Sequence, residues 1–417
     1  MELVAGDDVF DLYGRWNALA AFDRHGKLLG ATRAHDGDFF PESILDYSEA
    51  LRAAVTGECP GQYSDIFPLR VDIDITQACN ANCTFCFSRP YQREEYRGRW
   101  GGSADIESII SELAYNGTRT IRYCGGGEPL VHPSIRRLLQ APHEHGLRSC
   151  LITSGDLLSE ELLVLVFDYI DHLRWSVNAA QDSTRIKIHR ANMGANRLSD
   201  TFQMIESLIR RREKERGAFR CPMVWATFLV VPENFTEIRE ATKRLRDIGV
   251  DSVSFRPVYH GLTSPWTPAD LAHMEEALQA AAALGKPPRF CVFVPRRSVT
   301  ESPYLRPSDE FQECLSRRMR TVLEATAAGF ALQSCGMYRG SGAHRGLLLL
   351  PSASFSSVWA RAPESLHPLS APSECATCID ISMNVTLSFM RYVLLRDPYA
   401  RFVRALANPS EVLSCGR

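Results

Sequence analysis

From residue 69 onward the chain alternates between short apolar runs and longer segments with apolar residues at helical spacing. Runs rich in β-branched and aromatic residues predict strands, and they occur at 69–76, 120–124, 149–154, 172–178, 223–231 and 252–258. Between them, two sets of apolar residues share one helical face each, namely Ile106, Ile109, Ile110, Leu113 and Phe202, Ile205, Leu208, Ile209. Further helices are expected at 235–250 and at 267–285, the latter with Thr267 as its N-cap.

Six strand–helix units in series predict an α/β fold with a parallel sheet and helices outside it. Right-handed crossovers would curl this sheet into a partial (β/α)6 barrel of the TIM type. On such a scaffold, binding and catalytic groups belong at the carboxyl ends of the strands.

The pattern divides the chain into three predicted regions. Residues 67–290 are expected to form the barrel. Residues 1–66 read as an N-terminal extension, with a β-hairpin over 15–35 that turns at His25 and Gly26, followed by a helix over 41–57. After residue 290 the alternation is lost, so 291–417 is expected to be a smaller second domain.

Composition narrows the possible partners. The 417 residues carry 47 Lys and Arg against 49 Asp and Glu, which favours neither nucleic acid nor an anionic membrane. The N-terminus does not resemble a signal peptide, and no apolar run approaches the length of a membrane span. A cytoplasmic protein is expected, in which thirteen cysteines stay reduced and clustered ones are suited to metal binding.

Two motifs follow the first two predicted strands. "CNANCTFC" (79–86) offers Cys79, Cys83 and Cys86, a set suited to a cubane iron–sulfur cluster with one open iron, or to zinc with a distant fourth ligand. "GGGEP" (125–129) contains glycines that let a ligand approach the backbone closely, although such a run also occurs in simple turns. Neighbouring strand ends meet at one edge, so we expect the two motifs to form one site.

These paired motifs resemble those of the radical S-adenosylmethionine (SAM) superfamily, over roughly residues 69–260. The resemblance implies that Cys79, Cys83 and Cys86 hold a [4Fe–4S] cluster, whose open iron chelates the amino and carboxylate groups of SAM. An electron from a low-potential donor such as flavodoxin or ferredoxin would then cleave SAM to a 5′-deoxyadenosyl radical. Residues implied to contact SAM are Gly125, Gly126, Gly127 and Glu128 (ammonium), Phe85 (adenine), Ser176 and Asn178 (ribose) and Arg190 (carboxylate).

Four later cysteines form a second set: Cys314, Cys335, Cys375 and Cys378. Their chemistry fits zinc or a second cluster. Behind a radical SAM barrel, the arrangement resembles the twitch subdomain, a shortened SPASM domain. That resemblance implies an auxiliary [4Fe–4S] cluster that accepts an electron from the substrate. Cys291 is an alternative fourth ligand.

Three more residues near predicted strand ends are candidates for contact with substrate. Cys124 is a possible hydrogen-atom donor to a substrate radical, or simply a buried cysteine. Arg122 and Arg256 are candidates for binding anionic or hydroxylated groups, or for ordinary ion pairs.

Three functions remain open on the sequence. The first is oxidation of a C–H bond in a sugar- or aminocyclitol-like natural-product intermediate. The second is maturation of a ribosomally made peptide, with the hairpin over 15–35 offering an edge strand to a leader peptide. The third is a zinc-binding scaffold protein that retains the barrel.

Overall fold

A computed structural model gives the fold of the chain. It describes residues 16–22, 24–25, 27–33, 67–86, 88, 101–191, 197–217, 221–258, 265–286, 289–294, 314–326, 329–333, 335, 347–349, 353–360, 387, 390–397, 399 and 401–406. The helix expected over 41–57 and the cysteines Cys375 and Cys378 lie outside these residues.

The described strands include a ten-stranded sheet in the order β12-β11-β10-β3-β4-β5-β6-β7-β8-β9. The six predicted strands are confirmed, as β3 (Arg70–Asp74), β4 (Thr120–Tyr123), β5 (Arg148–Thr153), β6 (His172–Ser176), β7 (Met223–Val230) and β8 (Ser252–Pro257). All neighbours in this series pair in parallel. The parallel sheet expected from the alternating pattern is therefore present.

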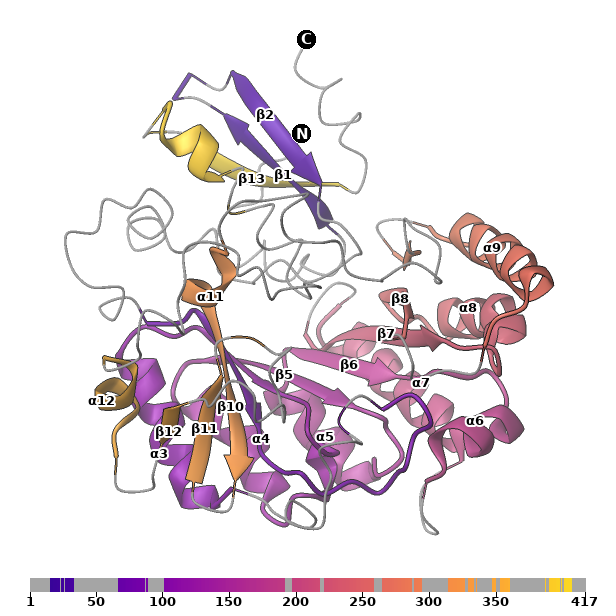
Figure 1. Ribbon diagram of the computed structural model, residues 1–417, viewed down its shortest axis with the longest axis horizontal. Coiled ribbons are helices and arrows are strands. Elements are labelled where there is room, and N and C mark those ends of the chain that lie inside the picture. The colour runs from indigo at the N-terminus through magenta and orange to yellow at the C-terminus, as the bar shows by residue number, and fades with distance from the viewer. Residues whose placement is uncertain are drawn as a thin grey trace.

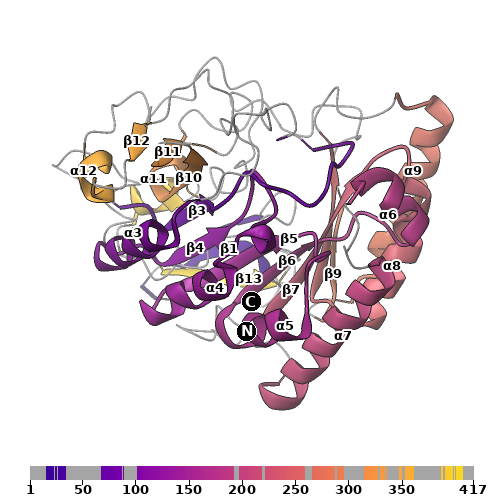
Figure 2. The same cartoon turned by 90° about the horizontal axis from the view of Figure 1, so that it is seen from below.

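Helices cover the outer face of the curved sheet (Figure 2). They are α3 (Ser103–Tyr115), α4 (Ile135–Glu144), α5 (Glu160–Tyr169), α6 (Asp182–His189), α7 (Leu198–Glu215), α8 (Ile238–Asp247) and α9 (Pro268–Ala283), with short 3₁₀ turns η6 (Pro129–Val131) and η7 (Phe235–Glu237). The predicted cap of α9 is confirmed, because Asp270 N donates to Thr267 Oγ1 at 3.1 Å. Apolar strand residues such as Val71 and Ile73 join one core with α3 residues such as Ile106.

Because strand side chains alternate, the residues between those core positions point to the inner face of the sheet. On β3 these are Arg70, Asp72 and Asp74, all buried. The interior of the partial barrel is therefore polar and charged next to β3, whereas the layer between sheet and helices is apolar.

The sheet continues past residue 290, where the sequence pattern predicted a boundary. β9 (Cys291–Phe293) pairs in parallel with β8. β10 (Arg320–Thr326) follows the short helix α11 (Ser316–Met319). It pairs in parallel with β3, at the end of the six-strand series opposite to β8. β11 (Gly329–Gln333) and β12 (Leu347–Leu349) follow in antiparallel, and α12 (Phe355–Trp359) contacts the core. The division at residue 290 stays a prediction.

A smaller three-stranded sheet lies apart from the large one (Figure 1). The predicted hairpin is present as β1 (Trp16–Phe22) and β2 (Leu28–Arg33), and β13 (Arg401–Leu406) pairs antiparallel with β1. The N-terminal hairpin and a segment near the C-terminus thus form one sheet, a long-range pairing that the local pattern did not predict.

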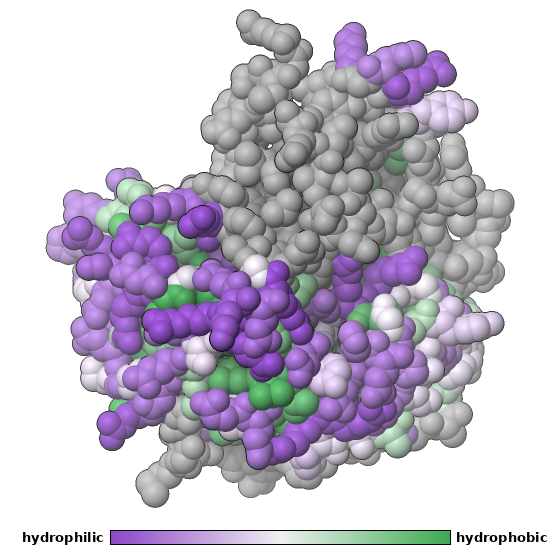
Figure 3. Space-filling model, turned by 180° about the vertical axis from the view of Figure 1, so that it is seen from behind, coloured by the Kyte–Doolittle hydropathy of each residue, from purple (hydrophilic) through white to green (hydrophobic). Residues whose placement is uncertain are grey.

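On the face shown in Figure 3, hydrophilic residues predominate over the described part, with hydrophobic residues in small groups between them. No helix among the described residues is long and apolar enough to cross a membrane.

Candidate functional site

The two sequence motifs meet at the carboxyl ends of β3 and β4. Gly127 N donates to Thr76 O and Glu128 N donates to Ala78 O, both at 2.9 Å. A Cβ on Gly127 would lie 1.8 Å from Ala78 O, so no other residue fits there without moving the backbone. The prediction that the glycine motif lies beside the cysteine motif is confirmed.

The cysteine loop, residues 79–86, is held on its other side by α6. Asn82 N donates to His189 O at 3.0 Å, and Thr84 N donates to Ile188 O at 2.9 Å. Phe85 is buried in an apolar cluster with Ile188, Val231 and Val258. Its ring contacts His189 edge-on, with centroids 5.7 Å apart. This apolar wall suits the face of a planar base, as predicted for Phe85.

The three cysteines of the loop are partly exposed. Burial raises the pKa of Cys79 to about 12, against an opposing hydrogen bond from the backbone of Ala81. Burial also raises the pKa of Cys83, and the Cys86 charge adds to the rise in both. The three sulfurs therefore lie within electrostatic range of one another. No group of three or more His, Cys, Asp or Glu side chains in the described ranges has converged into a metal-binding arrangement.

Soft thiol donors beside a glycine cradle are the donor set that an iron–sulfur cluster requires. The residues present therefore fit such a cluster chemically. Its assembly would have to draw the sulfurs together and remove their protons.

The carboxylate of Glu128 accepts hydrogen bonds from three groups of the protein itself. Its Oε1 accepts from Thr153 Oγ1 at 2.6 Å and from Leu130 N at 3.2 Å, and its Oε2 accepts from Ser154 N at 2.8 Å. Burial raises its pKa, and these hydrogen bonds oppose that rise. The structure thus gives this carboxylate a role in joining the glycine motif to the end of β5, while its predicted contact with the SAM ammonium stays a prediction.

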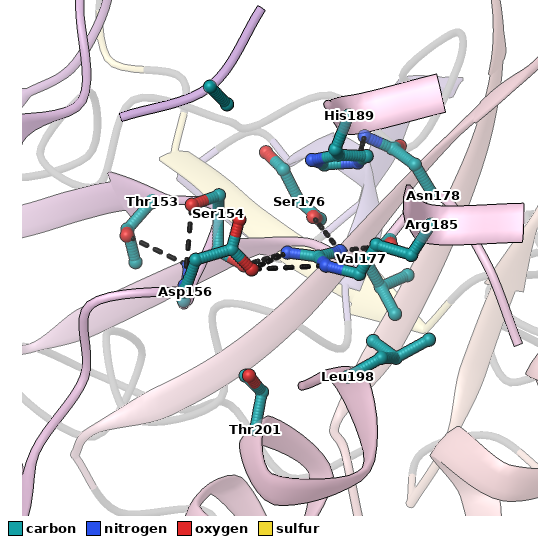
Figure 4. Close-up of polar contacts among 12 residues, drawn as sticks. Thr153, Ser154, Asp156, Ser176, Val177, Asn178, Arg185, His189, Leu198 and Thr201 are labelled. Carbon is teal, nitrogen blue, oxygen red and sulfur yellow. Dashed lines mark hydrogen bonds and ion pairs between the residues drawn. The ribbon is translucent and has the colours of Figure 1, made fainter. Parts of the chain in front are cut away.

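A buried ion pair that the sequence analysis missed lies beside this carboxylate. Arg185 of α6 contacts Asp156, which follows β5, with Nε at 3.0 Å from Oδ1 (Figure 4). The same guanidinium donates to Ser154 O at 2.7 Å and Val177 O at 2.6 Å. The pair links the loops after β5 and β6. In the sequence, an arginine in a polar helix cannot be told apart from a solvent-exposed one, so Arg185 gave no signal of its own. The one available signal was an acidic residue, Asp156, that could serve as its partner.

The residues predicted to contact SAM beyond β6 differ in their surroundings. Asn178 is buried, its Oδ1 accepts from Leu229 N at 2.7 Å and its Nδ2 contacts His189 Nε2 at 3.2 Å. Both ends of this amide therefore bind protein groups, and its predicted contact with ribose stays a prediction. Ser176 is partly exposed at the end of β6, and Arg190 is exposed in a left-handed conformation at the end of α6.

Inside the barrel, Arg122 pairs with the buried Asp72. Arg70 and Arg320 also reach this carboxylate, at 3.3 and 3.2 Å. Of the two roles that the sequence left open for Arg122, the structure shows an ion pair, within a buried network that joins β3, β4 and β10, while its contact with substrate stays a prediction. Arg256 is partly exposed, and its Nε donates to Ser254 Oγ at 3.2 Å.

Nearer the cysteine loop, the interior combines a thiol with two acids. Cys124 is buried and its Sγ lies 3.5 Å from Asp74 Oδ1. Glu324 of β10 is level with Asp74 in the parallel register and accepts from Gln77 Nε2 at 3.4 Å. Polar groups of the barrel interior therefore lie at the strand ends that lead into the two motifs.

Of the second cysteine set, the structure describes Cys314 and Cys335, both partly exposed. Cys314 precedes α11 and β10, and Cys335 follows β11. Because Val322 opposes Gln333 in this antiparallel pair, both cysteines belong to the same end of the hairpin. Cys291 is buried in β9, and six strands lie between β9 and β10 in the sheet order, so the sheet order does not bring it beside this hairpin.

Comparisons with known proteins agree with these motifs. A family model for the radical SAM superfamily matches residues 73–224. The chain is 25% identical over 186 residues to a tungsten-containing aldehyde ferredoxin oxidoreductase cofactor-modifying protein of Pyrococcus furiosus, covering 43% of this chain and 49% of that protein. It is 36% identical over 112 residues to a GTP 3′,8-cyclase of Chlorobaculum tepidum, covering 26% and 32%.

A third relative is a dTDP-4-amino-4,6-dideoxy-D-glucose ammonia-lyase of Streptomyces venezuelae, 22% identical over 224 residues, 52% of this chain and 45% of that protein. The matches therefore span less than half of each of these relatives.

Among solved structures, Streptococcus suis SuiB bound to S-adenosylmethionine aligns with a TM-score of 0.53 and 15% identity, covering 76% of this chain and 72% of that one. This likeness concerns the fold alone, a partial TIM-type barrel. The family match covers residues 73–224, which carry both motifs, so this part of the chain is a radical SAM domain.

Proposed function

We propose that the chain is a radical SAM oxidoreductase that dehydrogenates a C–H bond of a sugar- or aminocyclitol-like intermediate in natural-product biosynthesis. The observation that carries this proposal is the direct hydrogen bonding of the glycine motif to the residues immediately before the cysteine loop, Thr76 and Ala78, next to an interior lined by buried polar residues.

In this proposal Cys79, Cys83 and Cys86 hold the [4Fe–4S] cluster, and SAM lies between the cysteine loop and the glycine motif. When bound, the two groups supply a 5′-deoxyadenosyl radical by reductive cleavage of SAM. The backbone of Gly125, Gly126 and Gly127 would approach the methionyl end, and Phe85 would pack on the adenine. An external donor such as a flavodoxin or ferredoxin would supply the electron.

The protein's own part is to exclude water and orient the substrate. Interior groups near the motifs suit hydroxyl and amino substituents: Asp74 accepts, Arg256 donates, and Ser254 does both. The relative that acts on an aminodideoxy sugar nucleotide gives some support to such a substrate. Its matched region covers about half of this chain.

Oxidation requires that the substrate carbon lose a hydrogen atom, and that its hydroxyl lose a proton as one electron leaves. The auxiliary cluster on Cys314, Cys335, Cys375 and Cys378 is the proposed electron acceptor. The hairpin that places Cys314 and Cys335 at one end supports a shared site. If the reaction is instead redox-neutral, Cys124 is the candidate hydrogen-atom donor.

A second candidate function is maturation of a ribosomally made peptide. The three-stranded sheet has β2 at one edge of its strand order, and an edge strand can pair with an extended leader peptide. A solved structure with the same fold, SuiB, is described as bound to a precursor peptide.

The test is the iron and sulfide content per chain after anaerobic reconstitution, in the wild type and in a variant with Cys79, Cys83 and Cys86 replaced by alanine. Two cubane clusters predict about eight irons in the wild type and about four in the variant. SAM-dependent formation of 5′-deoxyadenosine should occur only in the wild type. Zinc without iron in both proteins would contradict the proposal and favour a zinc-binding scaffold.

A further inference from the structure

Four segments of the candidate site are joined by hydrogen bonds that close into a ring. Ala78, the residue directly before the cysteine loop, accepts at its carbonyl oxygen from Glu128 N of the glycine motif at 2.9 Å. The Glu128 carboxylate accepts from Ser154 N at 2.8 Å. Ser154 O in turn accepts from Arg185 Nη2 at 2.7 Å.

The ring closes through α6, which carries Arg185. Three and four residues later, the carbonyls of Ile188 and His189 accept from Thr84 N and Asn82 N. Thus the cysteine loop is bound on one side by the glycine motif and on the other by the end of α6. Arg185 is the link between α6 and the strand ends.

The Arg185 guanidinium uses all three of its nitrogens in this link. Nε and Nη2 donate to Asp156 Oδ1, Nη2 also to Ser154 O, and Nη1 to Val177 O and Ser176 O (Figure 4). Arg185 and Asp156 are both buried. A planar fork makes these contacts together, whereas a lysine ammonium at the same place reaches only some of them.

Two polar atoms on residues of this ring have no hydrogen-bond partner in the described part of the chain: Asp156 Oδ2 and His189 Nδ1. Both residues are almost fully buried. Because Asn178 Oδ1 accepts from Leu229 N, its Nδ2 must donate to His189 Nε2, which leaves the proton of the neutral ring on Nδ1. A buried acceptor and a buried donor without partners are typical of a site that receives a ligand.

We propose that Arg185, with Asp156 as its counter-ion, is the positioning residue that holds the cysteine loop against the strand ends so that cluster and SAM bind in one geometry. This inference rests on the proposed function. It assigns to Arg185 no contact with the substrate or with the reacting atoms.

The chain contains a matched control. Arg212 of α7 forms an equally buried ion pair with Asp251, at 2.6 Å, and also donates to Pro222 O. That pair joins α7 to the start of β8, and its hydrogen bonds to Pro222 O and from Val224 N lie outside the ring. Arg212→Lys therefore also replaces a buried guanidinium that pairs with an aspartate and a backbone carbonyl, but outside the ring.

The first readout is amide hydrogen exchange of Asn82 and Thr84 in the full-length chain before iron is added. Loss of a supporting contact next to a metal site typically lowers affinity about ten- to a hundredfold. We therefore expect about tenfold faster exchange of these two amides in Arg185→Lys and Asp156→Asn, but not in Arg212→Lys.

The second readout is the dissociation constant of SAM, by calorimetry on the reconstituted enzyme. We expect it to rise about tenfold or more in Arg185→Lys and to be unchanged in Arg212→Lys. If Arg185→Lys does not fold by circular dichroism, Asp156→Asn carries both measurements.

Unchanged amide exchange and unchanged SAM affinity in the site variants would overturn the positioning role. Equal losses in Arg212→Lys would also overturn it, because the effect would then be one of general stability. A wild type that binds no iron would overturn the proposed function instead. The exchange measurement does not depend on iron, so the two failures are distinguishable.

Discussion

At the scale of single residues, the site depends on the absence of a side chain at Gly127. Its backbone packs directly against Ala78, the residue before Cys79, and a Cβ on Gly127 would lie 1.8 Å from Ala78 O. The atoms that a Cβ would meet belong to the backbone rather than to a flexible side chain, so the steric clash can be relieved only if the two motifs move apart.

Gly127→Ala is therefore expected to abolish SAM binding and to reduce iron incorporation at the first cluster. Calorimetry with SAM and iron analysis check this. Gly146→Ala is the control, because a Cβ there meets nothing within 4 Å and only the positive φ of +69° opposes it, at a cost of about 1 kcal/mol. SAM binding retained in Gly127→Ala would contradict the close approach.

Glu128 shows what single-residue reasoning from sequence misses. The motif indicated an acid near a ligand, but its hydrogen-bond donors, Thr153 and Ser154, lie 25 and 26 residues further along the chain. The same holds for Asn178, since its partner Leu229 is 51 residues away. Residue types and spacing predicted which motifs meet. They did not predict which polar side chains are already satisfied.

Glu128→Gln should weaken SAM binding about tenfold, as expected for loss of a supporting contact. The Glu128 carboxylate accepts hydrogen bonds from both Ser154 N and Thr153 Oγ1. The glutamine amide has one oxygen and one NH2 group, so it would direct a donor toward one of these two groups and lose that hydrogen bond. Glu144→Gln, in an exposed ion pair with Arg137, is the control. A SAM titration that gives the same affinity for both variants would contradict the linking role of Glu128.

At the scale of elements, the sequence predicted what local periodicity determines. All six strands from β3 to β8 and the cap of α9 were found where expected. The parallel pairing of β10 with β3 and the antiparallel pairing of β13 with β1 were not predicted, because Arg320 and Arg70 are 250 residues apart and short strands carry no signal for their partner.

The β10–β11 hairpin gives a prediction at this scale. If it brings Cys314 and Cys335 into one auxiliary cluster, replacing both with serine should lower the iron content from about eight to about four per chain. SAM affinity should stay close to wild type, because the loop of Cys79 is untouched. Iron content that remains at the wild-type level would show that these cysteines bind no iron.

At the scale of the whole molecule, the segment beyond residue 290 is part of the barrel sheet. Asp72 sits among Arg70, Arg122 and Arg320, so one buried carboxylate joins β3, β4 and β10. Removing one partner of a buried charge network leaves the others uncompensated.

Asp72→Ala is therefore expected to lower the free energy of unfolding by about 3–5 kcal/mol. Urea denaturation, followed by circular dichroism, measures it. Asp247→Ala is the control, because its ion pair with Arg246 is half-exposed and such pairs contribute about 0–1 kcal/mol. Similar losses in both variants would show that the buried network does not tie the C-terminal segment to the barrel.

Global stability should also depend on pH through His172. Burial lowers its pKa well below 6.5, and the charges of Arg174 and Arg122 act in the same direction. Its Nδ1 lies 3.6 Å from Cys150 Sγ, and its ring contacts Trp225. The folded chain thus holds this histidine neutral, whereas the unfolded chain protonates it below about pH 6.5.

The unfolded state therefore binds more protons in that range, so stability falls as the pH drops below about 6.5, by up to about 1.4 kcal/mol per pH unit for each such histidine. Buried His189 has a pKa lowered in the same direction, so His172→Gln should remove only part of the slope. Urea denaturation between about pH 5 and pH 7 measures the slope, with the exposed His25→Gln as control. An equal slope in wild type and His172→Gln would mean that the barrel interior accommodates a charged imidazole, as a solvent-filled interior would.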